Sequence, residues 1–251
     1  MSLPRERFEG RSFIPFIVAG DPSLTTTAKL LPALSRLDPV AIELGVPFSD
    51  PTADGPVIQR AAQRALRSGT DLGKILRLLG GFRPNELAPV ILFSYYNPIL
   101  QFGLEKFVRV AAASHVAGVL VVDLPAEAAG VLQSRLSAKK IDLIFLVAPT
   151  TSDRRLKKIS KLASGFIYAV ARTGVTGTTG ELADESQELV ARIRKVSDLP
   201  VAVGFGIRNR AQARRVCRYA DAAVVGSRLV TALEESDGDV SAVLRCAQQF
   251  G

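Results

Sequence analysis

The stretch FIPFIVAGDPS (Phe13–Ser23) is the first apolar run of the chain, and the way it ends separates two possible folds. Its first seven residues are continuously apolar, as expected for a strand that is covered on both faces of a parallel sheet. An open, doubly wound sheet that binds a dinucleotide carries a G-x-G-x-x-G turn after this strand. The sequence has VAGDPS instead, so it favours a closed barrel.

Further apolar runs of the same kind follow at regular intervals. They predict strands over residues 40–44, 89–94, 118–123, 142–147, 165–170, 200–205 and 221–226. Segments with helical period lie between them, at residues 25–37, 57–66, 104–115, 126–140 and 186–196. Eight strands that alternate with helices in 251 residues predict an α/β fold, the (β/α)8 or TIM barrel. No linker or change of composition divides the chain, so we expect a single TIM-barrel domain over residues 1–251.

The composition excludes several classes of function. The chain carries 32 Lys plus Arg against 24 Asp plus Glu, but no aromatic residues interleave the basic ones, so we expect no nucleic-acid partner. No leader and no apolar run of membrane-spanning length is visible, so we expect no membrane association. Cys217 and Cys246 lie far apart with no histidine nearby, which predicts no metal site and a cytoplasmic location.

Two glycine-containing turns end the seventh and eighth predicted strands, GFGI (Gly204–Ile207) and GSRL (Gly226–Leu229). In a (β/α)8 barrel the active site lies at the carboxyl ends of the strands, and a phosphate often binds in the loops after strands 7 and 8. Glycines let main-chain N–H groups approach an oxyanion, and Ser227 adds a hydroxyl donor. Tight turns need glycine too, but the pair at these two strand ends predicts a phosphorylated substrate.

Two carboxylates mark the second strand and the loop after it. Glu43 ends the apolar run VAIEL, where we expect it to point into the barrel mouth, and Asp54 lies in TADGP. Carboxylates in different environments can divide the roles of acid and base. A salt bridge could instead explain Glu43, but no Lys or Arg lies within a predicted strand. Asp-Gly is also ordinary turn chemistry, so a turn role for Asp54 stays open.

A long loop, RTGVTGTTGEL (Arg172–Leu182), follows the sixth strand. It is either a plain connection or a lid that closes over substrate, with Gly177 as a further N–H donor to phosphate. His115, the one histidine, precedes the fourth strand, on the side of a barrel away from catalysis. A histidine-dependent nucleophilic triad or metal site is therefore not expected.

The motifs ELGVPFSDPTADGPVIQRA, YYNPI, VDLP, ARTGVTG, GFGI and VGSRLV occur in this order and closely resemble the tryptophan synthase alpha subunit. The resemblance covers nearly the whole chain, from PFIVAGDP onward. It implies a lyase of tryptophan biosynthesis that cleaves indole-3-glycerol phosphate to indole and glyceraldehyde 3-phosphate, without a cofactor in this chain. It also implies a beta subunit that holds pyridoxal phosphate and receives indole through a tunnel, in an α2β2 heterotetramer.

The resemblance further implies roles for individual residues. The catalytic residues would be Glu43, Asp54, Tyr168 and Thr176. Phe16 and Tyr95 would line the indole pocket, and the phosphate site would comprise Gly177, Gly204, Phe205, Gly206, Gly226 and Ser227. The YYNPI and DLP loops would face the partner subunit.

The chain departs from the family pattern at a short amino-terminal segment and at Val40, Ala117, Ala128 and Ala171. These departures could loosen the lid or alter the partner surface. They keep open one alternative to an active lyase, a weakly active or inactive subunit that binds and activates its beta partner. A different barrel enzyme for phosphosugars is a further alternative, and the motif that begins at Glu43 argues against it.

Overall fold

The computed structural model describes residues 2–10, 12–170, 181–204 and 206–250. Its parallel strands close into a barrel in the order β1 to β8, and β8 pairs back with β1. The strands are β1 Phe13–Val18, β2 Ile42–Gly45, β3 Val90–Ser94, β4 Val116–Val121, β5 Asp142–Val147, β6 Ile167–Val170, β7 Val201–Gly204 and β8 Ala222–Val225. The (β/α)8 barrel is confirmed, with strand ends that shift by at most two residues from those predicted.

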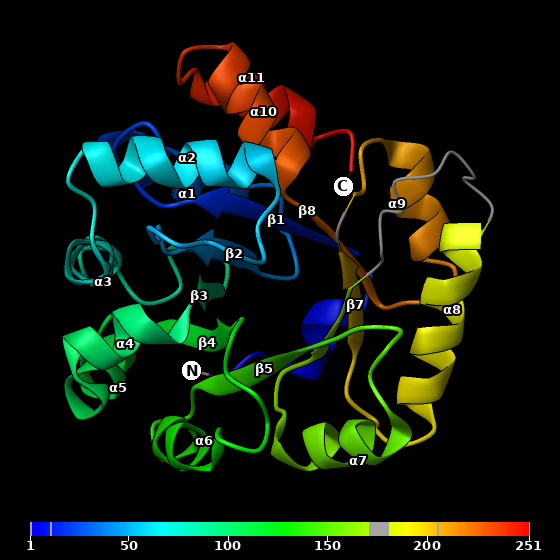
Figure 1. Ribbon diagram of the computed structural model, residues 1–251. Coiled ribbons are helices and arrows are strands. Elements are labelled where there is room, and N and C mark those ends of the chain that lie inside the picture. The colour runs from blue at the N-terminus through cyan, green and yellow to red at the C-terminus, as the bar shows by residue number, and fades with distance from the viewer. Residues whose placement is uncertain (1, 11, 171–180, 205, 251) are drawn as a thin grey trace.

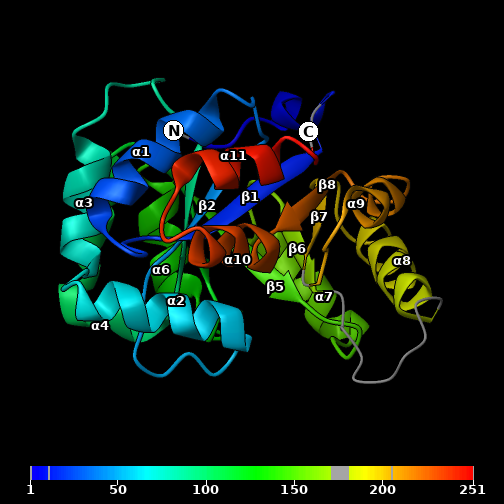
Figure 2. The same cartoon turned by 90° about the horizontal axis from the view of Figure 1, so that it is seen from above.

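Helices surround the barrel, as Figures 1 and 2 show from two directions. They are η1 Arg5–Phe8, α1 Leu24–Ser35, α2 Pro56–Arg67, α3 Leu72–Gly80, α4 Tyr96–Phe102, α5 Leu104–Ala113, α6 Gly130–Ser137, α7 Asp153–Leu162, α8 Glu181–Arg194, α9 Arg210–Val216, α10 Ser227–Glu235 and α11 Val240–Ala247. No helix among the described residues is both long and apolar enough to cross a membrane.

Two helical predictions were wrong. YYNPI was expected to be a loop, but α4 begins at Tyr96, whose main-chain N–H donates to Asp123 Oδ1 at 2.7 Å. The side chain of Asp123 thereby satisfies an otherwise unpaired donor of the first helical turn. The helix predicted over residues 126–140 is shorter, because a turn closed by Ala128 N and Pro125 O precedes α6.

Side chains of each strand alternate between two apolar layers. Ile42 and Leu44 belong to the outer layer between strands and helices, whereas Phe16 and Ile91, their neighbours on β1 and β3, belong to the inner layer. Glu43 stands between Ile42 and Leu44 and therefore points into the barrel interior. This position places a carboxyl group among apolar side chains.

The short amino-terminal segment closes the base of the barrel. Leu3 is 5% exposed and belongs to the inner apolar layer, and its main-chain N–H donates to Asp142 Oδ2 at 2.6 Å. The ring of Phe8 in η1 meets that of Phe166 edge-on at 5.9 Å. Leu3 and the single turn of 3-10 helix thus pack against the base of the barrel.

Replacing Leu3 by Ala is expected to lower the free energy of unfolding by about 2–4 kcal/mol, because the lost side chain leaves a cavity at the base. The carboxyl end of the barrel, where the active site of this fold lies, should be unaffected, so substrate turnover at 25 °C should stay within about twofold. Urea unfolding followed by circular dichroism measures the first quantity. A loss below about 0.5 kcal/mol would mean that Leu3 does not close the base.

Candidate active site

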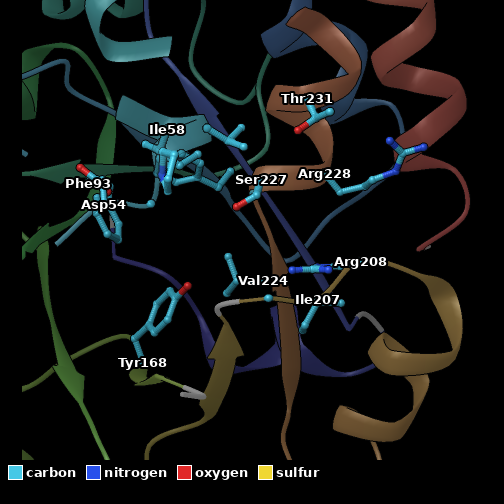
Figure 3. Close-up of a pocket in the computed structure, with 16 residues that line it drawn as sticks. Asp54, Ile58, Phe93, Tyr168, Ile207, Arg208, Val224, Ser227, Arg228 and Thr231 are labelled. Atoms are coloured by element: carbon cyan, nitrogen blue, oxygen red, sulfur yellow. The ribbon is translucent and has the colours of Figure 1, made fainter. Parts of the chain in front are cut away.

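A cavity of about 480 Å³ opens at the carboxyl end of the barrel. Strands β1, β3, β6 and β8 supply Phe16, Phe93, Tyr168 and Val224 to its wall, and the rest comes largely from the starts of helices α2 and α10. Figure 3 shows the side chains of Phe93, Tyr168 and Val224 around a common space. The walls are mostly apolar, and the polar groups stand at two ends, as in a site that binds an amphiphilic small molecule.

One polar end of the cavity is formed by Gly206, Arg208, Gly226 and Ser227. Gly226 is the N-cap of α10 and, among the described residues, no side-chain cap hydrogen bond forms there, so the first main-chain N–H groups of this helix can bind an anion. A Cβ on Gly226 would lie 3.1 Å from Phe16 Cδ1, so a larger residue would disturb the ring. Figure 3 shows Arg208 extending toward Val224, whereas Arg228 extends away from the cavity.

Asp54 forms the other polar end. Its carboxylate accepts a hydrogen bond from Tyr95 Oη at 3.1 Å, and the same hydroxyl accepts from Ala53 N at 2.9 Å. Gln59 Nε2 of α2 donates to the main-chain carbonyl of Asp54 at 2.9 Å. Burial raises the pKa of Asp54, and the hydrogen bond from Tyr95 opposes that shift. Asp54 therefore lies in a turn and also presents its carboxylate to the cavity.

Glu43 is fully buried inside the barrel, and among the described residues neither of its carboxyl oxygens has a hydrogen-bond partner. A salt bridge is therefore not the explanation for this residue. Burial raises the pKa of Glu43 to about 8. Tyr168 lies near enough that, after burial, the charge of Glu43 is the second cause that raises the pKa of the phenol.

The expectation that Glu43 opens onto the mouth needs correction, because Glu43 does not line the cavity. Gly45 follows on the same face of β2, two residues closer to the mouth. A Cβ on Gly45 would lie 2.8 Å from Phe16 Cζ, so the Phe16 ring occupies the space above Glu43. The ring of Phe93, 5.3 Å away, meets Phe16 edge-on. The rings of Phe16 and Phe93 thus lie on the mouth side of Glu43.

The sequence of this chain also matches a known protein family. The family model for the tryptophan synthase alpha chain matches residues 5–250. The chain belongs to the tryptophan synthase alpha chain family. The tryptophan synthase alpha chain of Acidiphilium cryptum is 50% identical over 234 residues, which cover 92% of this chain and 85% of that protein. The one from Neisseria gonorrhoeae is 44% identical and covers 97% of this chain and 95% of its own length.

Solved structures of the same family superpose closely on this chain. The tryptophan synthase alpha subunit of Campylobacter jejuni superposes with a TM-score of 0.90 at 32% identity and covers 100% of both chains. A chain from the tryptophan synthase a2b2 complex of Pyrococcus furiosus gives 0.89 at 37% identity, covering 95% of this chain and 97% of that one. Family membership confirms the resemblance seen in the sequence and the expected lyase activity on indole-3-glycerol phosphate.

Three departures from the tryptophan synthase alpha chain pattern are visible in the structure. Val40 and Ala117 are buried at the starts of β2 and β4, where an apolar side chain needs no polar partner. Ala128 is exposed, in the turn before α6. None of the three lines the cavity. Ala171 lies outside the described residues.

Two predicted binding residues of this alpha chain stand elsewhere than expected. Gly204 is not part of the cavity wall. A Cβ there would lie 1.9 Å from Tyr168 Oη, so the missing side chain makes room for the tyrosine. Tyr95 lines a smaller space beside the cavity, together with Phe16, Phe93 and Asp54. It contacts the site through the Asp54 carboxylate.

Some predicted residues cannot be placed, and others were not predicted. Thr176, Gly177 and Phe205 lie outside the described residues, as does most of the loop expected to be a lid. Arg208 and Ile58 line the cavity but were not predicted. The position of Arg208 directly after GFGI was a usable signal for it. No group of three or more metal-ligating side chains occurs in the described part of the chain.

Proposed function

We propose that this tryptophan synthase alpha chain cleaves indole-3-glycerol phosphate by a retro-aldol step in which Glu43 and Asp54 act on opposite sides of the indole-bearing end. Tyr168 and Thr176 assist them, Phe16 lines the indole pocket, and Tyr95 holds Asp54. The phosphate binds to main-chain and hydroxyl donors of Gly177, Gly206, Gly226 and Ser227, next to the turn of Gly204 and Phe205. Residues 1–251 act as one domain, since the family model spans nearly all of them.

The chemistry requires a proton at C3 of the indole ring before the C3–C3′ bond breaks. The protonated ring then accepts the electron pair of that bond, while a base removes the proton from the C3′ hydroxyl. A carboxyl group whose pKa is about 8 carries a proton at neutral pH and can return to the ionised form during the cycle. Glu43 therefore suits the proton transfers once the substrate displaces the Phe16 ring.

Asp54, in contrast to Glu43, must stay ionised. Positive charge develops at the indole nitrogen as C3 is protonated, and an ionised carboxylate that accepts the N–H hydrogen bond stabilises this charge. The hydrogen bond from Tyr95 favours the ionised form of Asp54 against the effect of burial. The two carboxyl groups thus differ in the way that their roles demand: within the described part of the chain Glu43 has no hydrogen-bond partner, whereas Asp54 accepts from Tyr95.

The observation that carries this proposal is the cavity with polar groups at its two ends. Asp54 stands at one end, Ser227 and Gly226 stand at the other, and apolar walls lie between them. An indole ring with a glycerol phosphate tail has the same order of chemical groups. Arg208 adds a positive charge at the phosphate end.

We further propose that a cytoplasmic beta subunit, which holds pyridoxal phosphate, receives the indole within an α2β2 complex. The Pyrococcus furiosus neighbour comes from such a complex. Leu100 of α4 and Val131 of α6 are 49% and 58% exposed, in the elements that contain YYNPI and follow DLP. Exposed apolar side chains on these elements suit a contact surface.

The experiment that tests the proposal measures indole release from indole-3-glycerol phosphate, first with this chain alone and then with a beta subunit. We expect indole and glyceraldehyde 3-phosphate in equal amounts, and faster release in the presence of the partner. A chain that releases no indole in either case, yet accelerates the reaction of the beta subunit, would be a binding subunit only. A different product would identify another phosphosugar enzyme.

Replacing Tyr95 by Phe is expected to lower kcat/KM for indole-3-glycerol phosphate at pH 7 by about 10-fold, because a hydrogen bond to a charged carboxylate is lost. That bond lowers the pKa of Asp54, so its removal raises this pKa and shifts the acidic limb of the pH–rate profile to higher pH. Tyr96→Phe is the matched control, since Tyr96 contacts Asp123 through its main-chain N–H and the substitution leaves its ring in place against the core. An acidic limb that does not move would show that Tyr95 does not tune Asp54.

A further inference from the structure

A cluster of two arginines and two carboxylates lies behind the cavity and joins three elements around it. Arg64 of α2 donates from Nε and Nη2 to the two carboxylate oxygens of Asp21, at 2.7 and 2.8 Å. Its Nη1 donates to Glu234 Oε1 of α10 at 2.5 Å. Arg60, one turn earlier on α2, donates to both oxygens of Glu234 at 2.9 and 2.8 Å. None of these four residues lines the cavity.

The cluster is anchored in the barrel. Asp21 follows the carboxyl end of β1, and its side chain is 2% exposed. Hydrogen bonds from Arg60 and Arg64 hold the pKa of Glu234 at about 2, so that carboxylate stays ionised at neutral pH. Apolar side chains of similar size often stabilise a fold as well as a buried ion pair does. What the forked guanidinium adds is a fixed geometry between its partners.

On one side the cluster leads to Asp54. Helix α2 begins at Pro56, and Gln59 holds the carbonyl of Asp54. Within the loop, the Thr52 and Asp54 N–H groups bond only to nearby carbonyls. Apart from the contacts of Tyr95, the placement of the Asp54 carboxylate therefore follows the placement of α2. Arg64 stands about 12 Å along the helix from Pro56, within the same rigid element.

On the other side the cluster leads to the phosphate end. Glu234 lies near the end of α10, and Ser227 is the first residue of the same helix. The two helices pack against each other, and Figure 2 shows α10 beside α2. Their first turns supply Pro56, Val57, Ser227 and Arg228 to the cavity wall. One guanidinium group thus connects the helix behind Asp54 with the helix that starts at the phosphate end.

We propose that Arg64 is a positioning residue, which sets the separation between Asp54 and the start of α10 and thereby selects ligands that reach both. The inference rests on the proposed function, because it takes indole and phosphate as the two groups that bind. Its consequence is specific. Loss of the Arg64 contacts should weaken a ligand that spans both ends far more than a ligand that occupies the phosphate end alone.

The test compares two ligands by calorimetry on the full chain. One is 3-(indol-3-yl)propyl phosphate, which cannot be cleaved and spans the cavity, and the other is inorganic phosphate. For Arg64→Gln, we expect the affinity for the spanning ligand to fall by about 10-fold and the affinity for phosphate to change by less than twofold. Arg64→Lys keeps the charge without the fork, so it should recover only part of the loss. We also expect kcat to fall from the wild type to Arg64→Lys and further to Arg64→Gln.

Arg7→Gln is the control. Arg7 pairs with Asp38 at 3.2 Å and with carbonyls of Pro39 and Val40 at the base of the barrel. This substitution should lower the melting temperature without changing the ratio of the two affinities. Glu234→Gln leaves one acceptor oxygen and no charge, so it weakens only the bridge between α2 and α10 and leaves the Asp21 pair in place. It should lower the ratio by about threefold, even if Arg64→Gln does not fold.

The possible failures can be told apart. If the wild-type chain does not bind the spanning ligand more tightly than phosphate, the proposed function is wrong. If it does, and folded Arg64→Gln or Glu234→Gln keeps the wild-type ratio, only the positioning role is wrong. Arg64 would then stabilise the fold as Arg7 does. Equal losses of affinity for both ligands would likewise overturn the positioning role.

Discussion

Replacing Glu43 by Gln is expected to lower kcat for indole-3-glycerol phosphate cleavage by about 10³- to 10⁴-fold, the range for loss of a general acid–base. Glutamine has nearly the same shape but cannot deliver a proton to C3 or remove one from the C3′ hydroxyl. The phosphate end of the cavity lies on other strands, so the affinity for inorganic phosphate should change by less than twofold. Steady-state kinetics and phosphate titration measure the two effects.

The same substitution lowers activity but is expected to remove a loss of stability that the wild-type protein suffers as the pH rises. Because the pKa of Glu43 is raised from 4.5 to about 8 on folding, the folded chain retains a proton that the unfolded chain loses. The wild-type protein therefore loses about 1.4 kcal/mol of stability for each pH unit between roughly pH 4.5 and 8, relative to Glu43→Gln. Urea unfolding at pH 5 and pH 8 tests this. Parallel changes in both proteins would show that Glu43 is not held neutral.

Replacing Asp54 by Asn has the second large expected effect, a fall in kcat of about 10²- to 10³-fold. An amide can still accept the indole N–H hydrogen bond, but it supplies no negative charge when positive charge develops on the ring. The Tyr95 hydroxyl and Gln59 contacts do not require the charge, so the loop should keep its place.

Asp50 provides a matched control for Asp54. It lies in the same loop, but it is exposed and does not line the cavity, and Asp50→Asn should leave kcat within about twofold. An Asp54→Asn variant that keeps most of the wild-type kcat would remove Asp54 from the catalytic set and leave its turn role alone.

The barrel itself was predictable because its strands are covered on both faces. In the run DLIFLV every residue after Asp142 is apolar, and the structure has β5 over the same residues, Asp142–Val147. Helix α3 was not predicted, although Leu72, Ile75, Leu76 and Leu79 form its buried face. Helices α2 and α3 both lie between β2 and β3. The alternation of strands and helices predicts one helix between two strands, so it gave no reason to expect a second.

The polar residues at the two ends of the cavity could be predicted from the sequence, but the packing of the buried residues around it could not. Asp54 and Ser227 are polar residues in the segments that follow β2 and β8, and the fold alone brings such segments together. That Phe16 covers Glu43 depends on the missing side chain at Gly45, which the spacing of residues does not reveal. The contacts of Arg64 with Asp21 and Glu234 span 43 and 170 residues, so no local pattern predicts them.

The most direct test of the account is a crystal structure of this chain with 3-(indol-3-yl)propyl phosphate bound. We expect the phosphate at the start of α10, within hydrogen-bond distance of Gly226 and Ser227. The indole N–H should lie on the Asp54 carboxylate, with the Phe16 ring moved so that Glu43 reaches the ring carbon. A phosphate bound elsewhere, or an indole ring that leaves Glu43 sealed behind Phe16, would contradict the proposed division of roles.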